Sequence, residues 1–366
     1  GEKADEIADG DLLLIDGAAG EVVAQPDEQT LADFAERQKA DAAHRAMLAQ
    51  YKDKEGATSD GRRVIIEGNI GTPDDAVRVA ELGGEGVGLF RSEFLFMDRT
   101  DLPSEEEQFA AYKKACEIMQ GKPVIIRTLD IGGDKEVPAL ALEKEQNPFL
   151  GYRAIRICLN QPELFLIQLR ALLRAAQYGD LRIMFPMISS VDEVRGAKQV
   201  LEQAKDMLTA EGVPFNPNVK VGIMVEIPVA AVCADVLAKE VDFFSIGTND
   251  LIQYSCAVDR INEKISYLYR PLHPGVLRLI AMTAKAANEN GIEVGVCGEM
   301  AGTAGMAPVL CGLGVTNLSM SASAMLAAKA DLAKHSCGEC KELADKLLAC
   351  ASASDAERIF ADWRES

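Results

Sequence analysis

Beyond residue 62, short runs of apolar and β-branched residues alternate with longer segments whose apolar positions recur at helical spacing. The runs predict eight strands, at 64–67, 86–90, 124–127, 182–185, 219–225, 243–246, 293–296 and 317–320. The segments between and after them predict helices at 73–82, 104–119, 162–178, 190–211, 228–239, 273–290, 303–312 and 321–333. Strands separated by helices pair in parallel through crossovers, so eight such units predict an α/β fold of the (β/α)₈ TIM-barrel type. A doubly wound open sheet is the alternative.

The first sixty residues follow a different pattern. In 1–30, two short apolar runs flank a glycine-containing turn, which predicts a β-hairpin or strand pair that cannot form a domain alone. In 31–60, a polar, alanine-rich stretch with amphipathic spacing predicts a linker helix from Leu31 to about Lys54. Three regions follow from these patterns: 1–30, 31–60, and 61–366 with the barrel and helices at its C-terminal end.

The predicted strands end repeatedly in charged or reactive residues. In a (β/α)₈ barrel the catalytic residues project from these carboxyl ends. A charge there carries a desolvation cost that a purely structural barrel has no reason to meet. The residues are Asn69, Arg91 with Ser92 and Glu93, Arg127 with Asp130, Met184 to Pro186, Glu226, Gly247 to Asp250, Cys297 with Gly298 and Glu299, and Ser319 with Ser321.

Two kinds of polar group among them indicate a site for a phosphorylated anion and a divalent metal. Arg91 and Arg127 end two strands, and Arg260 lies in the loop after the sixth; planar guanidinium groups hold phosphate and carboxylate oxygens in bidentate fashion. Glu226 and Asp250 come from neighbouring strands. Two carboxylates with substrate oxygens and water are a usual way to hold Mg²⁺.

Thiols are the third kind of candidate. Cys297 lies at a glycine-containing strand-to-helix turn, a position that can favour reactivity, although a single cysteine is more often a small buried hydrophobe. Cys337 and Cys340 form a Cys-x-x-Cys pair near His335 and Cys350, which resembles half a zinc site or a redox pair. Because a second pair at ligand spacing is missing, a polar helix start is the favoured interpretation there.

Composition narrows the classes of function. The 366 residues are 48% hydrophobic and 26% charged, enough for a large core and a well-solvated surface. The formal net charge of −19 argues against nucleic-acid binding, which needs the opposite field. No secretory signal opens the chain and no apolar run is long enough to span a membrane, so we expect a soluble protein. Nine scattered cysteines suit a reducing cytoplasm.

Five motifs resemble the C-terminal domain of the Enzyme I family of the bacterial phosphoenolpyruvate:sugar phosphotransferase system. They are 86–98 (GVGLFRSEFLFMD), 127–135 (RTLDIGGDK), 147–156 (NPFLGYRAIR), 242–251 (DFFSIGTNDL) and 297–299 (CGE). The resemblance runs from about Asp60 to about Leu332. Residues 9–30 resemble the closing strands of that family's phosphohistidine domain, and 31–60 resemble its connecting helices.

The resemblance implies a substrate and the residues that hold it. Arg91, Arg127 and Arg260 would contact phosphoenolpyruvate, and Asn249 and Asp250 would help to position it. These residues coincide with the anion-binding set that the strand ends predict.

The resemblance also implies the metal and the acid. Glu226 and Asp250 would hold Mg²⁺, and Cys297 would protonate the enolate carbon as pyruvate forms, with Glu299 the next candidate acid. Lys135 and Arg153 are further candidates on the phosphate side.

Two features of the family have no counterpart in this sequence. The phosphoacceptor histidine of Enzyme I lies in a Gly/Ser-rich motif, and none of His44, His273 and His335 has that context. The helical part that docks the phosphocarrier HPr has no counterpart either. We therefore expect a chain that begins partway through a domain, binds phosphoenolpyruvate, and cannot complete phosphoryl transfer alone. HPr would be a partner of the full-length protein only, and the resemblance implies a homodimer through the barrel.

Other functions fit parts of the sequence. The barrels of pyruvate phosphate dikinase and phosphoenolpyruvate synthase resemble this one and share its chemistry, although 94–97 and 131–135 favour Enzyme I. A lyase or aldolase of the pyruvate-kinase-like barrels would use Mg²⁺ to stabilise an enolate without phosphoryl transfer. A third, non-enzymatic role is that of a dimerisation module.

Overall fold

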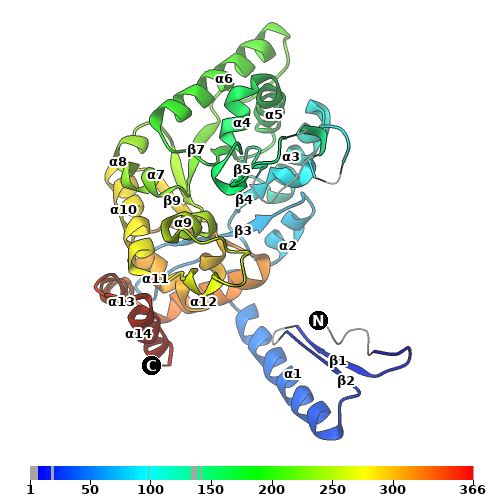
Figure 1. The fold of residues 1–366 in the computed structure, drawn as a ribbon, viewed down its shortest axis with the longest axis vertical. Helices are drawn as coiled ribbons and strands as arrows, with labels where there is room; N and C mark the ends of the chain where they lie inside the picture. The colour runs from blue at the N-terminus through cyan, green and yellow to red at the C-terminus, as the bar shows by residue number, and fades with distance from the viewer. Residues whose placement is uncertain (1–6, 18–19, 98, 133–137, 141, 366) are drawn as a thin grey trace. The chain divides into compact units, whose positions relative to one another are not determined.

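The chain forms two units, Gly1–Gln50 and Tyr51–Ser366 (Figure 1). The computed structural model describes residues 7–17, 20–97, 99–132, 138–140 and 142–365. In the first unit, strands β1 (Leu13–Asp16) and β2 (Glu21–Ala24) pair as an antiparallel hairpin, as the sequence predicts. Helix α1 (Glu28–Ala49) follows. It starts earlier than predicted, because Asp27 provides an N-cap by accepting the N–H of Thr30, and it ends before Lys54.

The second unit is a closed barrel of eight parallel strands, in the order β10-β3-β4-β5-β6-β7-β8-β9. The predicted barrel is therefore confirmed, and the open sheet is excluded. Each predicted strand is found: four match their predicted bounds, and the other four differ by one to three residues at one or both ends. The strands are β3 (Ile65–Ile70), β4 (Val87–Arg91), β5 (Val124–Arg127), β6 (Leu181–Phe185), β7 (Lys220–Val225), β8 (Phe243–Ile246), β9 (Glu293–Val296) and β10 (Asn317–Met320).

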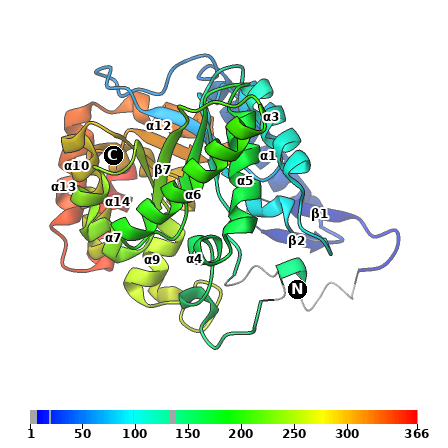
Figure 2. The ribbon, with the colours of Figure 1, turned by 90° about the horizontal axis from the view of Figure 1, so that it is seen from above.

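Helices surround the strands, as the view from above shows (Figure 2). Two of the longer ones begin with capping boxes, in which Ser104 and Glu107, or Ser190 and Glu193, exchange hydrogen bonds across the first turn. The helices are α2 (Asp75–Glu81), α3 (Glu105–Met119), α4 (Ile155–Asn160), α5 (Pro162–Ala175), α6 (Val191–Ala210), α7 (Pro228–Val232), α8 (Ala234–Leu237), α9 (Thr248–Cys256), α10 (Pro274–Asn290), α11 (Met306–Gly312), α12 (Met325–Lys334), α13 (Cys337–Leu348) and α14 (Ala353–Glu365).

Three helical predictions were wrong in detail. The segment 228–239 holds two short helices, α7 and α8, because Cys233 between them leaves the helical conformation. Helices α11 and α12 begin at Met306 and Met325, each after a short 3₁₀ turn, rather than at 303 and 321. Helix α9 was not predicted. It follows β8 after Gly247 alone, so the apolar run and the helix share one stretch of sequence.

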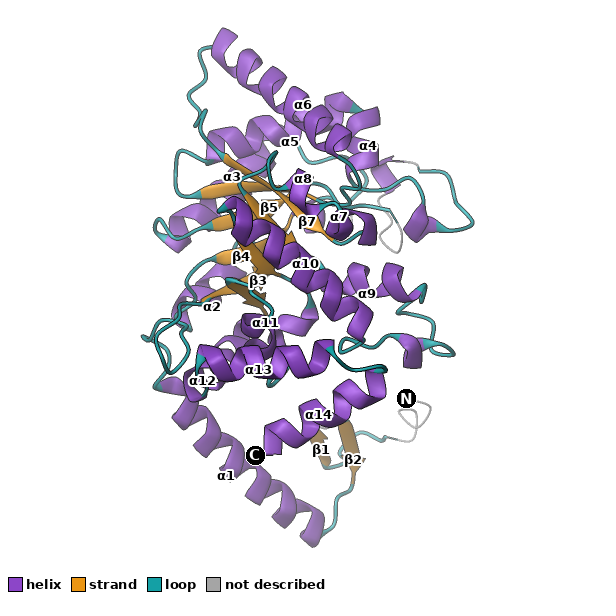
Figure 3. Cartoon of the chain, turned by 90° about the vertical axis from the view of Figure 1, so that its left-hand side faces the viewer, coloured by secondary structure: helices purple, strands orange, loops and turns teal. Residues whose placement is uncertain are grey.

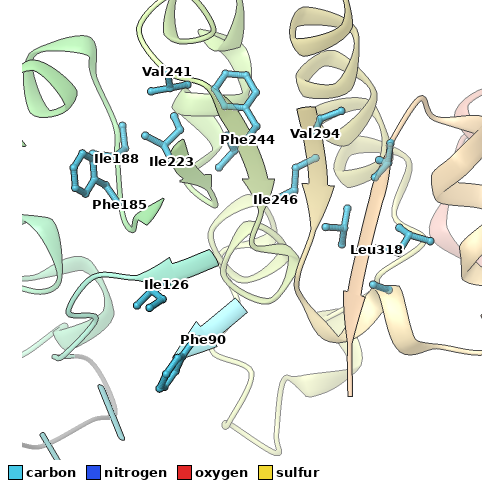
Figure 4. Packing of buried hydrophobic residues seen from close by; sticks show 14 of the residues in the cluster. Phe90, Ile126, Phe185, Ile188, Ile223, Val241, Phe244, Ile246, Val294 and Leu318 are labelled. Atoms are coloured by element: carbon cyan, nitrogen blue, oxygen red, sulfur yellow. The ribbon is translucent and has the colours of Figure 1, made fainter. Parts of the chain in front are cut away.

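Alternation along the strands divides the barrel's side chains between its interior and the helices. Outward-facing residues join one large core between strands and helices, in which Phe90, Ile126 and Phe244 are buried (Figure 4). Inward-facing residues form a separate small cluster: Leu89, Ile125, Met184, Met224, Phe243 and Cys297. Because side chains alternate with period two, the residue two positions after a member of this cluster also faces the barrel interior, nearer the carboxyl end of its strand.

Two expectations from composition can be compared with the structure. The nine cysteines, all of which are described, are free thiols. Among the described helices, none combines the length and the apolar character that crossing a bilayer requires.

Candidate functional site

The carboxyl end of the barrel holds a pocket of about 110 Å³. Apart from Glu299, the second candidate acid, every described residue to which the resemblance assigns a role in binding or catalysis lines this pocket, and Lys135 lies outside the described residues. The lining residues are Leu89, Arg91, Arg127, Asp130, Arg153, Met224, Glu226, Gly247, Asn249, Asp250, Arg260, Cys297 and Gly298. They lie near the carboxyl ends of five strands or in the segments that follow those ends, so the fold brings together residues up to about two hundred positions apart.

Strand alternation explains why three of these residues point into the barrel. Arg91, Arg127 and Glu226 each follow, by two positions, a member of the inner apolar cluster. Arg91 and Arg127 are direct neighbours in the register of β4 and β5. The apolar cluster therefore forms the floor of the pocket, and the charged side chains stand directly above it.

Of the two arginines that end strands at this site, Arg127 is the more deeply buried. Its side chain is 7% exposed, and it pairs with Glu93 and, at 2.8 Å, with Asp130. Burial lowers the pKa of Arg127, but the two carboxylates outweigh that effect and the pKa lies above its usual value. The guanidinium group is thus charged and fixed before any ligand arrives.

Arg153 links the two sides of the pocket. Its Nη2 lies 2.9 Å from Oδ1 of Asp130 and 3.3 Å from Oδ2 of Asp250, and its Nη1 donates to the hydroxyl of Tyr254 at 3.0 Å. Arg260 approaches Asp250 from the other side, at 3.4 Å. Asp250 therefore lies between two arginines.

Three residues of this network were missed as site residues: Glu93, Asp130 and Tyr254. The first two were noted at strand ends but given no role. A signal for them existed, because guanidinium groups that converge on one barrel face need anionic partners to be buried together. Tyr254 lies in the unpredicted helix α9, so nothing in the predicted elements brought it to the pocket.

Arg91 differs from the other arginines because its side chain is exposed. Its guanidinium carbon lies 5.5 Å from the centroid of the Phe94 ring, a cation–π contact that leaves the charged group in water. Arg91 therefore reaches the rim of the pocket rather than its interior.

Two buried carboxyl groups lie together at the centre of the site. Oε1 of Glu226 accepts the N–H of Met187 at 2.6 Å. Burial, first, and then the carboxylates of Asp250 and Asp130 raise the pKa of Glu226 to about 8. Oδ1 of Asp250 is buried and accepts no hydrogen bond from the described residues. Within the described ranges, no group of three or more His, Cys, Asp or Glu residues could hold a metal by itself.

Cys297 lies between the apolar floor and the charged rim. Gly298 follows it, and a Cβ at that position would overlap Oγ1 of Thr248, so only glycine lets the strand end pack against α9. Asn69 donates to the carbonyl oxygen of Cys297 at 2.9 Å and fixes the backbone there. Burial raises the pKa of Cys297 to about 11, against a lowering hydrogen bond with Ser245. The thiol is therefore held in its protonated form.

Asn249 is fixed by its neighbour from the next strand end. Its Oδ1 accepts the backbone N–H of Glu299 at 3.0 Å, and its Nδ2 lies 3.4 Å from Oε1 of Glu299. Glu299 itself is exposed and does not line the pocket. Asn249 is thus oriented, while Glu299 stands outside the enclosed part of the site.

Comparison with known proteins gives the same picture of the chain. A family model described as "PEP-utilising enzyme, PEP-binding domain" matches residues 45–337. That segment includes every strand of the barrel and every residue that lines the pocket.

Three relatives carry one name, phosphoenolpyruvate-protein phosphotransferase. The protein from Priestia megaterium is 51% identical over 351 residues, which cover 96% of this chain and 61% of the relative. The protein from Bacillus subtilis strain 168 is 50% identical over 360 residues, covering 98% and 63%. The protein from Staphylococcus carnosus strain TM300 is 47% identical over 362 residues, covering 99% and 63%. The chain thus spans about three-fifths of the length of these relatives.

Proposed function

This chain belongs to the family of PEP-binding domains of PEP-utilising enzymes, and we propose that it serves this role in a phosphoenolpyruvate-protein phosphotransferase of the Enzyme I type. The observation that carries the proposal is the convergence of arginines, buried carboxylates and one thiol on a single pocket at the carboxyl end of the barrel. The named relatives do not favour a dikinase, a synthase or an enolate lyase.

The arginines would bind the phosphate and carboxylate groups of phosphoenolpyruvate. Nε of Arg127 and Nε of Arg153 are buried and have no hydrogen-bond acceptor among the described residues. Buried donors without acceptors are costly, so a ligand that supplies oxygen atoms to them is favoured. Arg91 and Arg260 would hold the more exposed side of the substrate, and Asn249 would orient it.

The charges of the site explain why a metal would be needed. Among the described residues that line the pocket or pair with Arg127, guanidinium groups and carboxyl groups are equal in number: Arg91, Arg127, Arg153 and Arg260 face Glu93, Asp130, Glu226 and Asp250. A substrate with both a phosphate and a carboxylate adds only negative charge to this balance. A divalent cation bound with the substrate would restore it.

Glu226 and Asp250 are suited to hold Mg²⁺. Burial, and then repulsion from Asp250, raise the pKa of Glu226, and Oδ1 of Asp250 accepts no hydrogen bond from described residues. An oxygen-seeking cation would relieve both unfavourable features. Two carboxylates with substrate oxygens and water make a suitable ligand set for Mg²⁺. When bound, the cation would supply positive charge next to the substrate oxygens.

Cys297 would deliver the proton that turns the enolate carbon into the methyl group of pyruvate. Its raised pKa keeps the thiol protonated at neutral pH, which an acid requires before it acts. It lines the pocket beside Met224 and Leu89, so the proton is offered from the apolar floor, while the oxygens of the substrate face the charged rim. Glu299 is exposed, which makes it the weaker candidate acid.

The remaining parts of the reaction would involve groups beyond this pocket. The three histidines, all described, do not line it. We place the phosphoryl acceptor on a histidine of the longer protein, which would pass the group to HPr, and we place Lys135 on the phosphate side. The barrel would dimerise, and the free thiols suit the cytoplasm. Residues 1–30 would close the phosphohistidine domain, and 31–60 would connect it to the barrel.

Calorimetric titration of the chain with phosphoenolpyruvate tests this proposal. We expect binding in the presence of Mg²⁺ and none in the presence of a chelator. Undiminished affinity in chelator would contradict the metal requirement. Absence of binding in both conditions would contradict the assignment of phosphoenolpyruvate as the substrate. Phosphorus NMR of the complex separates a phosphotransferase domain, which must hold the phosphate, from a lyase, which has no need to.

A further inference from the structure

Three thiols gather where α13 begins, in a part of the barrel unit that the substrate pocket does not use. Cys337 is the first residue of α13, and Cys340 lies one turn later. Cys311 comes from α11, which packs against α13 (Figure 3). Cys311 and Cys340 are buried, whereas Cys337 is only half-buried. The cluster therefore has two protected sulfur atoms and one that solvent reaches.

The accessible thiol is held by a cation and an anion from the segment that leads into β3. Sγ of Cys337 accepts a hydrogen bond from Nη1 of Arg62 at 3.4 Å. The backbone N–H of Cys337 donates to Oδ1 of Asp60 at 3.0 Å. An arginine next to a partly exposed sulfur atom is typical of reactive cysteines.

The two protected thiols lie against each other because their helices approach closely. A Cβ at Gly312 would overlap the carbonyl oxygen of Cys340, so a larger residue cannot occupy that position. Hydrogen bonding with Cys340 lowers the pKa of Cys311, and hydrogen bonding with Cys311 raises the pKa of Cys340. The thiols of Cys311 and Cys340 are therefore close enough to interact directly.

We propose that Cys337 and Cys340 are a redox couple that a peroxide oxidises to a disulfide. Residues three apart on a helix have Cβ atoms about 5–6 Å apart, and a disulfide brings them to about 3.5–4.5 Å. The first turn of α13 must therefore tighten slightly, which a helix terminus tolerates best. Cys-x-x-Cys is also the spacing of dithiol redox pairs.

The chemistry balances with one peroxide. The sulfur of Cys337 attacks one peroxide oxygen, the O–O bond breaks, and the first water leaves as the sulfenic acid forms. The sulfur of Cys340 then attacks the sulfur of Cys337, so that the S–S bond forms, the S–O bond breaks and the second water leaves. The proton that Cys340 gives up goes to the departing oxygen, which leaves as that second water. Two thiols are oxidised, and the peroxide is reduced to two waters.

A metal site is the other use for clustered thiols, and the structure argues against it. Within the described ranges no group of cysteine, histidine and acidic residues could hold a metal. The cation at this cluster is the guanidinium group of Arg62, which donates to Cys337; burial lowers the pKa of Arg62, and its interactions with the three cysteines raise it. A thiophilic metal ion would have to displace this guanidinium group.

Peptide mapping after brief treatment of the whole chain with hydrogen peroxide tests the proposal. We expect a disulfide between Cys337 and Cys340 that dithiothreitol removes. We also expect Cys337 to be consumed at least tenfold faster than Cys233 and Cys256, the other two half-buried thiols. A bridge between Cys311 and Cys340 instead, or equal rates at Cys337 and Cys233, would overturn it.

Substitutions separate the roles of the thiols without relying on the native bridge. Cys340→Ser should leave a sulfenic acid on Cys337 that dimedone traps, because the resolving thiol is gone. Arg62→Gln should slow the oxidation of Cys337 several-fold, and Cys233→Ser is the matched control that should leave it unchanged. A Cys340→Ser variant in which dimedone labels no Cys337 would also refute the couple.

Discussion

The two ends of the barrel both bury arginine among carboxylates, yet they do so differently. At the amino end, Arg182 donates to Asp180 at 2.8 Å and to Glu293 at 2.9 Å, and both carboxylates are 38% exposed. The space enclosed there is about 10 Å³, lined in part by Glu67. At the carboxyl end, Arg127 and its partners border a pocket of about 110 Å³.

The difference lies in the space that surrounds the groups each network leaves unsatisfied. At the amino end, the charge of Arg182 is balanced within the protein by carboxylates that remain in contact with water. At the carboxyl end, Nε of Arg127, Nε of Arg153 and Oδ1 of Asp250 are buried without a hydrogen bond to any described residue, although Arg260 lies 3.4 Å from that oxygen of Asp250. Oε1 of Glu67 at the amino end is also buried with no hydrogen-bond partner among the described residues, but the space of about 10 Å³ there leaves no room for a ligand. Unused donors and acceptors around an open volume therefore indicate a site built for a ligand, whereas an unsatisfied group in a closed space only costs stability.

Removing the acid should have the largest effect. In a chain supplied with its missing phosphoacceptor partner, Cys297→Ala should lower pyruvate formation by about 10²–10⁴-fold, the usual contribution of a general acid. Binding of phosphoenolpyruvate with Mg²⁺ should change little, because the charged rim stays intact. Both quantities are measured on the same protein, by turnover and by calorimetry.

Exchange of pyruvate methyl protons in deuterium oxide checks the same residue without phosphoryl transfer. We expect Cys297→Ala to stop the exchange. Exchange at the parent rate would mean that Cys297 only packs the floor of the pocket, and Glu299→Gln would then be the variant to study.

Exchanging the arginines for glutamine at the two ends tests the comparison directly. Arg127→Gln should weaken binding of phosphoenolpyruvate about tenfold or more, since a charge-assisted contact contributes roughly 1.5–3 kcal/mol. Arg182→Gln is the matched control and should leave the dissociation constant within about twofold while lowering the melting temperature. Calorimetry and thermal unfolding of both variants provide the two measurements.

Loss of folding must be separated from loss of binding at Arg127. Breaking a buried ion pair is itself strongly destabilising, so Arg127→Gln should also unfold at a lower temperature. Arg127→Lys keeps the charge but loses the planar fork, and we expect it to fold well and still bind several-fold more weakly. If both Arg127 variants bind phosphoenolpyruvate as tightly as the parent does, Arg127 does not hold the ligand and the two ends of the barrel differ only in shape.

The sequence predicted the barrel and its pocket better than the network that supports the pocket. β-branched runs that end in Arg91, Arg127 and Glu226 carry local information, and the alternation of side chains places these ends together. The pairing of Arg127 with Glu93 and Asp130 depends on how neighbouring strand ends meet in three dimensions, which periodicity does not encode. The amino-end network was missed for the same reason.

The pH dependence of stability should show what burying Glu67 at the amino end of the barrel costs. Burial, first, and then Glu293 raise the pKa of Glu67 to about 7, although Arg182 opposes the shift. A carboxyl whose folded pKa is raised contributes most stability below its unfolded pKa, near 4.5, and loses that contribution as pH rises through 7. Between pH 5 and pH 8 the parent should therefore lose on the order of 2 kcal/mol from this group.

Glu67→Gln removes that titration, because the amide stays neutral throughout. Denaturant unfolding at pH 5 and pH 8 should show a smaller loss of stability in the variant than in the parent, with unchanged affinity for phosphoenolpyruvate at pH 7. An equal loss in both proteins would show that Glu67 is solvated in the folded chain.

Substitution of Arg91 should have the smallest effect, because Arg91 lines the same pocket as Arg127 but is not buried as Arg127 is. It is the register neighbour of Arg127, yet its side chain is exposed and lies over Phe94. A hydrated guanidinium group gains less on binding an anion than a buried one, because water screens the interaction. Arg91→Gln should weaken binding by about threefold to tenfold at low salt, which is roughly 0.6–1.4 kcal/mol. The deficit should shrink in high salt, whereas that of Arg127→Gln should persist. A salt-independent deficit at Arg91 would mean that the rim closes over the substrate and buries this arginine as well, so that the carboxyl end becomes enclosed only when it is occupied.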